Sequence, residues 1–145
     1  MKNFVMNACL SLSFLSLIPT TANAVDNGSQ SSASFDWSPI IEAIIKVESE
    51  GNARAVSGNS VGVMQITPVL VKECNNILKK RKSKMRYTME DRYSVEKSKE
   101  MFLLIQSYHN QQNNVEKAIR SWNGGPRYSK RATNSYFQKV MRHLK

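Results

Sequence analysis

Apolar residues recur three and four positions apart along much of the chain, which is the spacing of one face of an α-helix. This spacing predicts five helices, over about residues 39–50, 68–78, 94–109, 113–122 and 132–144. A further helical turn is expected over residues 61–67. No segment alternates between apolar and polar residues convincingly enough to predict a β-strand. The pattern therefore predicts an all-α domain of five to six helices.

The first of these helices carries a carboxylate where its apolar face continues. Ile41, Ile44 and Ile45 form that face, and Glu48 holds the next position along it. A carboxylate on a buried face is destabilising unless it is paired or protonated, and desolvation raises its pKa. A general acid needs a raised pKa to hold its proton near neutral pH. Glu48 is therefore a candidate catalytic acid. The alternative is a glutamate at a helix end that turns out to water.

Other residues mark the helix boundaries. Ser38 is expected to cap the first helix, with Pro39 at its first position. Asn113 and Glu116 have the spacing of a capping box at the start of the fourth helix. Tyr136 lies on the apolar row of the last helix, which favours a core position. The alternative for Tyr136 is that its hydroxyl reaches a groove.

Residues 1–24 have the features of a secretory signal peptide: a basic start, an apolar run over residues 5–18, and small residues before Val25. The apolar run is too short to span a bilayer comfortably. We expect cleavage after Ala24, a flexible linker over residues 25–36 and a folded domain over residues 37–145. The mature protein is then expected to be periplasmic or secreted, with no integral membrane segment and as a monomer.

The chain is strongly basic, with a net charge of +10, or +9 once Lys2 is removed with the signal peptide. Such a charge favours an anionic partner, which can be nucleic acid, a membrane surface or a cell-wall polymer. Export argues against nucleic acid. Residues 79–92 are here called the basic connector. Six of its seven cations crowd into residues 79–86 and should face water: Lys79, Lys80, Arg81, Lys82, Lys84 and Arg86.

Cysteine and histidine add little chemistry. Cleavage removes Cys9 and leaves Cys74 alone, so no intrachain disulfide can form, and Cys74 is expected to be a buried apolar residue. Neither His109 nor His143 stands at a recognisable spacing from another metal-ligating residue. We therefore predict no metal and no cofactor.

Three short segments stand out when they are taken together. They are Glu48-Ser49, then Gly-Val-Met-Gln-Ile at residues 62–66, then Ser-Trp-Asn-Gly-Gly-Pro at residues 121–126. In this order and at these spacings they resemble the lytic transglycosylases of the soluble, lysozyme-like (SLT) type. The resemblance covers about residues 39–141. It is strong over residues 41–68 and 118–126, and weak through the basic connector and the third helix.

The resemblance implies a lysozyme-like fold and cleavage of the β-1,4 bond between N-acetylmuramic acid and N-acetylglucosamine in peptidoglycan, with a 1,6-anhydro-muramyl product. Glu48 matches the single catalytic acid/base of the family. The residues that match its substrate-binding motifs are Ser49, Gly62, Gln65, Trp122 and Asn123. Two positions depart from the family pattern: Trp122 replaces the usual tyrosine, and Thr67 stands where methionine is frequent.

The distribution of acidic residues bears on the mechanism. No acidic residue lies between Glu50 and Glu73, so the sequence near the motifs offers no second carboxylate. A site with one carboxylate requires the 2-acetamido group of the substrate to act as nucleophile. If Glu90 or Asp91 reached the site, hydrolysis of the lysozyme muramidase type would be possible. A non-catalytic cationic module that binds cell wall or nucleic acid is the alternative outside enzymes.

The physiological role stays open. Wall turnover fits a small exported enzyme of this type, and so does opening of the wall for an envelope-spanning secretion or conjugation apparatus.

Overall fold

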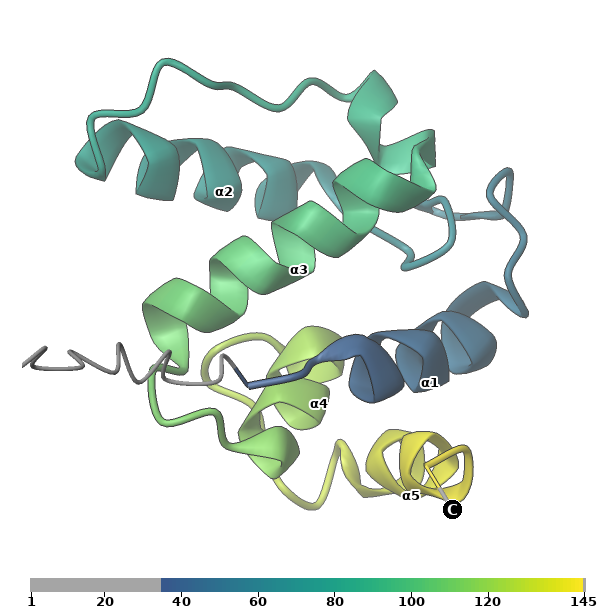
Figure 1. Ribbon diagram of the computed structural model, residues 1–145. Coiled ribbons are helices and arrows are strands. Elements are labelled where there is room, and N and C mark those ends of the chain that lie inside the picture. Colours follow the sequence, from purple (N-terminus) through teal and green to yellow (C-terminus); the bar gives the residue numbers. More distant parts are fainter. Residues whose placement is uncertain (1–34, 145) are drawn as a thin grey trace, which may run out of the picture. The chain divides into compact units, whose positions relative to one another are not determined.

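A computed structural model describes residues 35–144 (Figure 1). The described residues form five α-helices, a two-stranded hairpin and one short 3₁₀ helix. In chain order these are α1 (Ser38–Ser49), β1 (Val56–Ser57), β2 (Ser60–Val61), α2 (Pro68–Lys80), η1 (Glu90–Tyr93), α3 (Val95–His109), α4 (Val115–Gly124) and α5 (Asn134–Arg142). The predicted all-α class is confirmed. The predicted signal peptide and residues 25–34 of the predicted linker lie outside the described residues.

The helices pack in two groups. Helix α2 packs against α3, while α1, α4 and α5 pack against one another (Figure 1). Phe102 of α3 connects the groups, because its ring lies 5.6 Å from Trp37 and 5.2 Å from Trp122 between ring centroids. Buried apolar side chains from every α-helix fill the space between them. Functional side chains near this junction are therefore held by a packed core.

Helix α1 has the predicted apolar face but begins one residue earlier than expected. Ile41, Ile44 and Ile45 are all buried. The Ile41 N–H donates to the Trp37 carbonyl at 2.9 Å, so the cap is Trp37. Ser38 is the first helical residue, and its N–H donates to the Asp36 side chain at 2.9 Å. The prediction of Ser38 as the cap was wrong, because the helix already begins at Ser38 and the cap position falls on Trp37, whose side chain makes no capping hydrogen bond.

The segment between α1 and α2 differs most from the prediction. Val56 pairs with Val61 and Ser57 with Ser60 in an antiparallel hairpin. Two residues per strand are too few for an alternating pattern, so the sequence offered no strand signal. The predicted helical turn over residues 61–67 was also wrong. Val61 and Ile66 form a bridge through N···O distances of 3.2 and 2.9 Å, and residues 62–65 make the turn between them.

The boundaries of α4 and α5 shift as well. The side chain of Asn114, not Asn113, caps α4 by accepting the Lys117 N–H at 2.8 Å. Asn113 has a left-handed backbone conformation, with φ of 52°. It therefore belongs to the loop before α4 and not to the helix. Helix α5 begins at Asn134 rather than near residue 132.

The basic connector and Cys74 behave as predicted. The six cations over residues 79–86 are exposed, and Lys79 and Lys80 belong to the last turn of α2. Cys74 is fully buried, and burial raises the pKa of its thiol to about 12. The thiol is therefore protonated and unreactive near neutral pH. Within residues 35–144, no helix is long and apolar enough to cross a membrane.

Candidate active site

Glu48 occupies the last turn of α1 and is half-buried. The hydroxyl of Tyr136, on α5, donates a hydrogen bond to Glu48 Oε1 at 2.7 Å. Burial raises the pKa of Glu48 above its ordinary value, while the hydrogen bond from Tyr136 acts in the opposite direction. Burial and the Glu48 carboxylate both raise the pKa of Tyr136, so its hydroxyl stays protonated and remains a donor. The pair can therefore hold and release a proton at the other carboxylate oxygen, Oε2.

The cavity at Glu48 brings together several of the residues singled out in the sequence. Its volume is about 160 Å³, and its other lining residues are Ser60, Gln65, Thr67, Leu70, Trp122 and Asn123. Glu48 is the one carboxylate in this lining. Neither Glu90 nor Asp91 contributes to it. Asp91, on η1, instead accepts hydrogen bonds from the backbone N–H and the hydroxyl of Thr88, at 2.6 and 3.0 Å. The site is chemically an isolated acid beside neutral polar groups.

Gln65 contributes to this cavity from a strained turn. Its backbone is left-handed, with φ of 51°. Its side-chain nitrogen Nε2 donates to the carbonyl oxygens of Gly62 at 3.0 Å and Ala55 at 3.3 Å. The nitrogen therefore holds the turn against the hairpin, and the amide oxygen is the group that Gln65 can offer to a ligand. Strain at a functional site persists when its surroundings fix the conformation, as these two bonds do.

Gly62 has a packing role. Its φ is +78°, and a Cβ added here would collide with the backbone carbonyl oxygen of Arg92. Glycine is thus needed twice over, for the left-handed backbone and for the close approach of η1. The Arg92 side chain stabilises this approach of η1 to the hairpin by donating a hydrogen bond to the Asn59 carbonyl oxygen at 3.2 Å. Gly62 does not line the Glu48 cavity, although the family motif implies a substrate-binding residue.

Ser49 also acts through the scaffold. Its hydroxyl donates to the Val63 carbonyl at 2.8 Å and accepts the Gly51 N–H at 3.2 Å. The bond to Val63 ties the end of α1 to the turn that carries Gln65. Ser49 lies outside the lining of the Glu48 cavity. The structure thus gives it a positioning role beside the acid.

Trp122 and Asn123, at the end of α4, form the opposite wall. The indole nitrogen of Trp122 donates to the Met64 carbonyl at 3.2 Å, so this donor is already used within the protein. The half-buried ring remains available as an apolar surface at the cavity. Asn123 is exposed at the rim and is free to face a polar ligand.

The sequence matches the family model of the transglycosylase SLT domain over residues 28–144. The chain belongs to this family. Searches of curated proteins and of solved structures found no significant match. The protein is therefore a lytic transglycosylase that acts on peptidoglycan, and its helical domain is of the lysozyme-like SLT kind, as the motifs implied. The family match begins inside the predicted linker, and the predicted domain boundaries stay a prediction.

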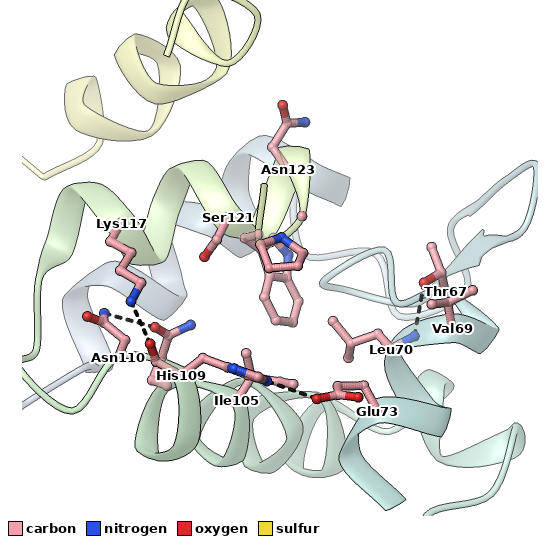
Figure 2. Close-up of a pocket in the computed structure, with 14 residues that line it drawn as sticks. Thr67, Val69, Leu70, Glu73, Ile105, His109, Asn110, Lys117, Ser121 and Asn123 are labelled. Carbon is pink, nitrogen blue, oxygen red and sulfur yellow. Dashed lines mark hydrogen bonds and ion pairs between the residues drawn. The ribbon is translucent and has the colours of Figure 1, made fainter. Parts of the chain in front are cut away.

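A larger cavity of about 510 Å³ adjoins the Glu48 cavity of this SLT domain (Figure 2). The two share Thr67, Leu70, Trp122 and Asn123 in their linings, so they are immediate neighbours. The larger cavity runs between α2, α3 and α4, and its lining adds the side chains of Glu73, His109 and Lys117. A ligand bound beside Glu48 can therefore reach the edge of this second cavity.

Tyr136→Phe should reduce kcat about tenfold and move the basic limb of the kcat/KM pH profile to higher pH. The hydroxyl donates to the Glu48 carboxylate, and loss of this bond raises the pKa of Glu48 further. The acid must be protonated in the free enzyme, so a higher pKa extends activity toward alkaline pH. Tyr128→Phe, which removes a hydroxyl outside the Glu48 cavity, is the matched control. A loss of activity with no shift of the profile would contradict the proton-holding role of Tyr136.

Proposed function

We propose that Glu48 alone supplies the acid and the base, and that the product carries a 1,6-anhydro-muramyl end. The observation that carries the proposal is a half-buried Glu48 whose cavity has no other carboxylate among the described lining residues. Retaining and inverting glycosidases usually need a second carboxylate close to the first. With one carboxylate, the 2-acetamido group of muramic acid has to act as the nucleophile.

The proposed reaction begins with protonation of the glycosidic oxygen by Glu48. The bond from C1 of muramic acid to this oxygen breaks, and the oxygen leaves as the 4-hydroxyl of N-acetylglucosamine. The acetamido carbonyl oxygen bonds to C1 as this happens. Glu48, now a carboxylate, accepts the proton of the 6-hydroxyl, whose oxygen bonds to C1 and displaces the acetamido oxygen. Glu48 ends protonated and ready for another turnover.

Tyr136 supports both protonation states of the acid. Its hydroxyl donates to Oε1, which leaves Oε2 as the oxygen that carries and receives the proton. The same hydrogen bond stabilises the carboxylate that exists between the two steps. Gln65, Trp122 and Asn123 are proposed to contact the sugars, since all three line the cavity with Glu48.

The masses of the products test this mechanism. Purified peptidoglycan is digested with the enzyme, and the released muropeptides are analysed by liquid chromatography and mass spectrometry. Anhydro ends lack one water relative to reducing ends, so the proposal expects the dehydrated masses. Reducing ends as the main product would overturn it in favour of a lysozyme-type muramidase.

The proposed location is the periplasm or the exterior of the cell, after cleavage behind Ala24. The basic, apolar and small-residue order of residues 1–24 supports export, and a peptidoglycan substrate lies outside the cytoplasm. Mass spectrometry of protein recovered from cell fractions should find a mature N-terminus at Val25.

An envelope-spanning secretion or conjugation apparatus is proposed as a partner. The test is whether deletion of the gene impairs assembly of such an apparatus.

Replacing four connector cations with glutamine should weaken binding to insoluble cell wall at low ionic strength. Lys80 and Arg81 are left unchanged because they donate to Tyr108 and Ser107 of α3, each at 3.0 Å. Charge attraction between exposed groups is screened by salt, so the difference from wild type should shrink as salt rises. The substituted residues are Lys79, Lys82, Lys84 and Arg86.

A control variant with the same charge change shows whether the position of the cations on the protein matters for wall binding. It replaces four exposed cations on α1 and on the C-terminal part of the chain: Lys46, Arg131, Lys139 and Arg142. Wall pelleting assays at several salt concentrations compare the two variants. Equal losses in both would mean that net charge alone governs binding, and the connector would have no specific role.

A further inference from the structure

The second cavity contains a buried polar group that lacks a partner. Gln106 of α3 lines this cavity and is 2% exposed. Its Oε1 accepts a hydrogen bond from Asn110 Nδ2 at 3.1 Å. Its Nε2 finds no acceptor among the described residues. Buried donors are almost always satisfied, so this amide indicates a ligand that brings an acceptor oxygen into the cavity.

The same cavity has a cation at one end. Lys117 of α4 is exposed there, and Figure 2 shows it beside His109 and Asn110. Its Nζ donates to the His109 carbonyl oxygen at 2.6 Å, and an ammonium group has two further protons to donate. Lys117 makes no ion pair within residues 35–144. Its charge is therefore available to an anionic ligand.

Two further features of the lining are a contact between Glu73 and His109 and an apolar wall. Glu73 of α2 pairs with the ring of His109 at 2.9 Å, so its carboxylate already has a donor (Figure 2). Leu70, Ile105 and Trp122 supply apolar surface. The cavity thus combines an apolar wall, a free ammonium group and an unsatisfied amide donor. This combination suits a ligand with small apolar groups, carboxylates and amide carbonyls.

We propose that the second cavity binds the stem peptide of the glycan strand, with Lys117 facing a peptide carboxylate and Gln106 donating to an acceptor oxygen of the same peptide. The proposal rests on peptidoglycan being the substrate. Stem peptides carry alanine methyl groups and free carboxylates, whereas the N-acetylated sugars of the strand are uncharged. An ammonium group therefore favours the peptide over a further sugar. The shared lining of the two cavities lets one substrate occupy both.

The test compares kcat/KM on three soluble substrates of equal strand length. The first carries stem peptides, the second has had them removed by an amidase, and the third carries peptides with amidated carboxylates. Lys117→Met keeps the apolar part of the side chain and removes the charge. Lys139→Met, on the exposed side of α5 and outside both cavities, is the control with the same charge change.

Lys117→Met should lower the ratio of kcat/KM on peptide-bearing to peptide-free strands about tenfold, the size expected for loss of a charged hydrogen bond. Lys139→Met should leave the ratio unchanged. Wild type on amidated strands should resemble Lys117→Met on peptide-bearing ones. An equal loss on peptide-bearing and peptide-free strands would assign the cavity to sugar and overturn the proposal, and so would no loss on either.

Gln106→Met provides a second variant, because it removes the unsatisfied donor and nearly keeps the side-chain length. Asn110 keeps its other acceptor, the Asn114 carbonyl at 2.8 Å, so the loop after α3 retains a bond. The proposal expects the ratio of kcat/KM on peptide-bearing to peptide-free strands to fall in this variant too. An unchanged ratio in a folded protein would contradict the proposed role of Gln106 in binding the peptide. A wild-type protein that cleaves none of the substrates would instead refute the peptidoglycan activity itself.

Discussion

Glu48→Gln is expected to abolish peptidoglycan cleavage while leaving the fold intact. Glutamine has nearly the same shape, and its carbonyl oxygen can still accept the Tyr136 hydrogen bond, but it has no proton to transfer. Loss of a general acid typically reduces the rate about 10²–10⁴-fold, and more is expected when one residue serves as acid and base. Release of soluble muropeptides measures the effect. Glu42→Gln, an exposed change on the same helix, is the control, and activity of Glu48→Gln above about a tenth of wild type would contradict the assignment.

The same variant should be more stable than wild type at neutral pH. Burial raises the pKa of Glu48 in the folded state, so the folded protein holds this proton more tightly than the unfolded chain does. The resulting stabilisation is present below the ordinary pKa of 4.5 and is lost as the pH rises through the folded-state value. Glutamine carries no charge at any pH. The Tm difference between variant and wild type should therefore be largest at neutral pH and shrink toward pH 4.5 and below.

Gly62→Ala should strongly destabilise the domain. A side chain at φ of +78° is strained, and its Cβ would collide with the Arg92 carbonyl oxygen. The strain alone is worth about 1–3 kcal/mol, and the collision adds to it because backbone on both sides would have to move. In a domain of this size, each 1 kcal/mol lowers Tm by about 4–8 °C. A decrease of about 10 °C or more is therefore expected by differential scanning calorimetry.

Gly58→Ala separates the two causes. Gly58 also has a positive φ, +57°, but a Cβ added there meets nothing within 4 Å. This variant should show only the backbone strain and a smaller decrease in Tm. Equal decreases in both variants would mean that the approach of η1 to Gly62 contributes nothing to stability. Because the turn after Gly62 carries Gln65, Gly62→Ala should also lower the activity of the protein that remains folded.

Local patterns in the sequence determine much of the helical structure of this protein. The spacing of Ile41, Ile44 and Ile45 predicted the buried face of α1 and marked Glu48 as a carboxylate in an apolar position. Such periodicity depends on the geometry of one helix, so it can be read from neighbouring residues. The short motifs around Glu48, Gln65 and Asn123 likewise indicated the family, and three of their residues line one cavity with the acid.

Motif matches located residues without revealing what they do. Ser49 and Gly62 match substrate-binding positions, yet the structure uses them to fix the turn that carries Gln65. Thr67 looked like a departure from the family, and its side chain accepts the Leu70 N–H at 3.3 Å as the cap of α2. The roles of Ser49 and Gly62 depend on neighbours in space, which a one-dimensional match does not contain, whereas the cap at Thr67 is a local feature.

The sequence by itself determined the helical class and the family, and it marked Glu48 as a candidate acid, because these follow from local periodicity and short motifs. Only the tertiary structure decided that the Tyr136 hydroxyl meets Glu48, since 88 residues separate them along the chain. It also decided the short hairpin and the second cavity with Gln106 and Lys117, which assembles from three helices. Contacts between distant segments depend on how whole helices pack, and no local pattern specifies that packing.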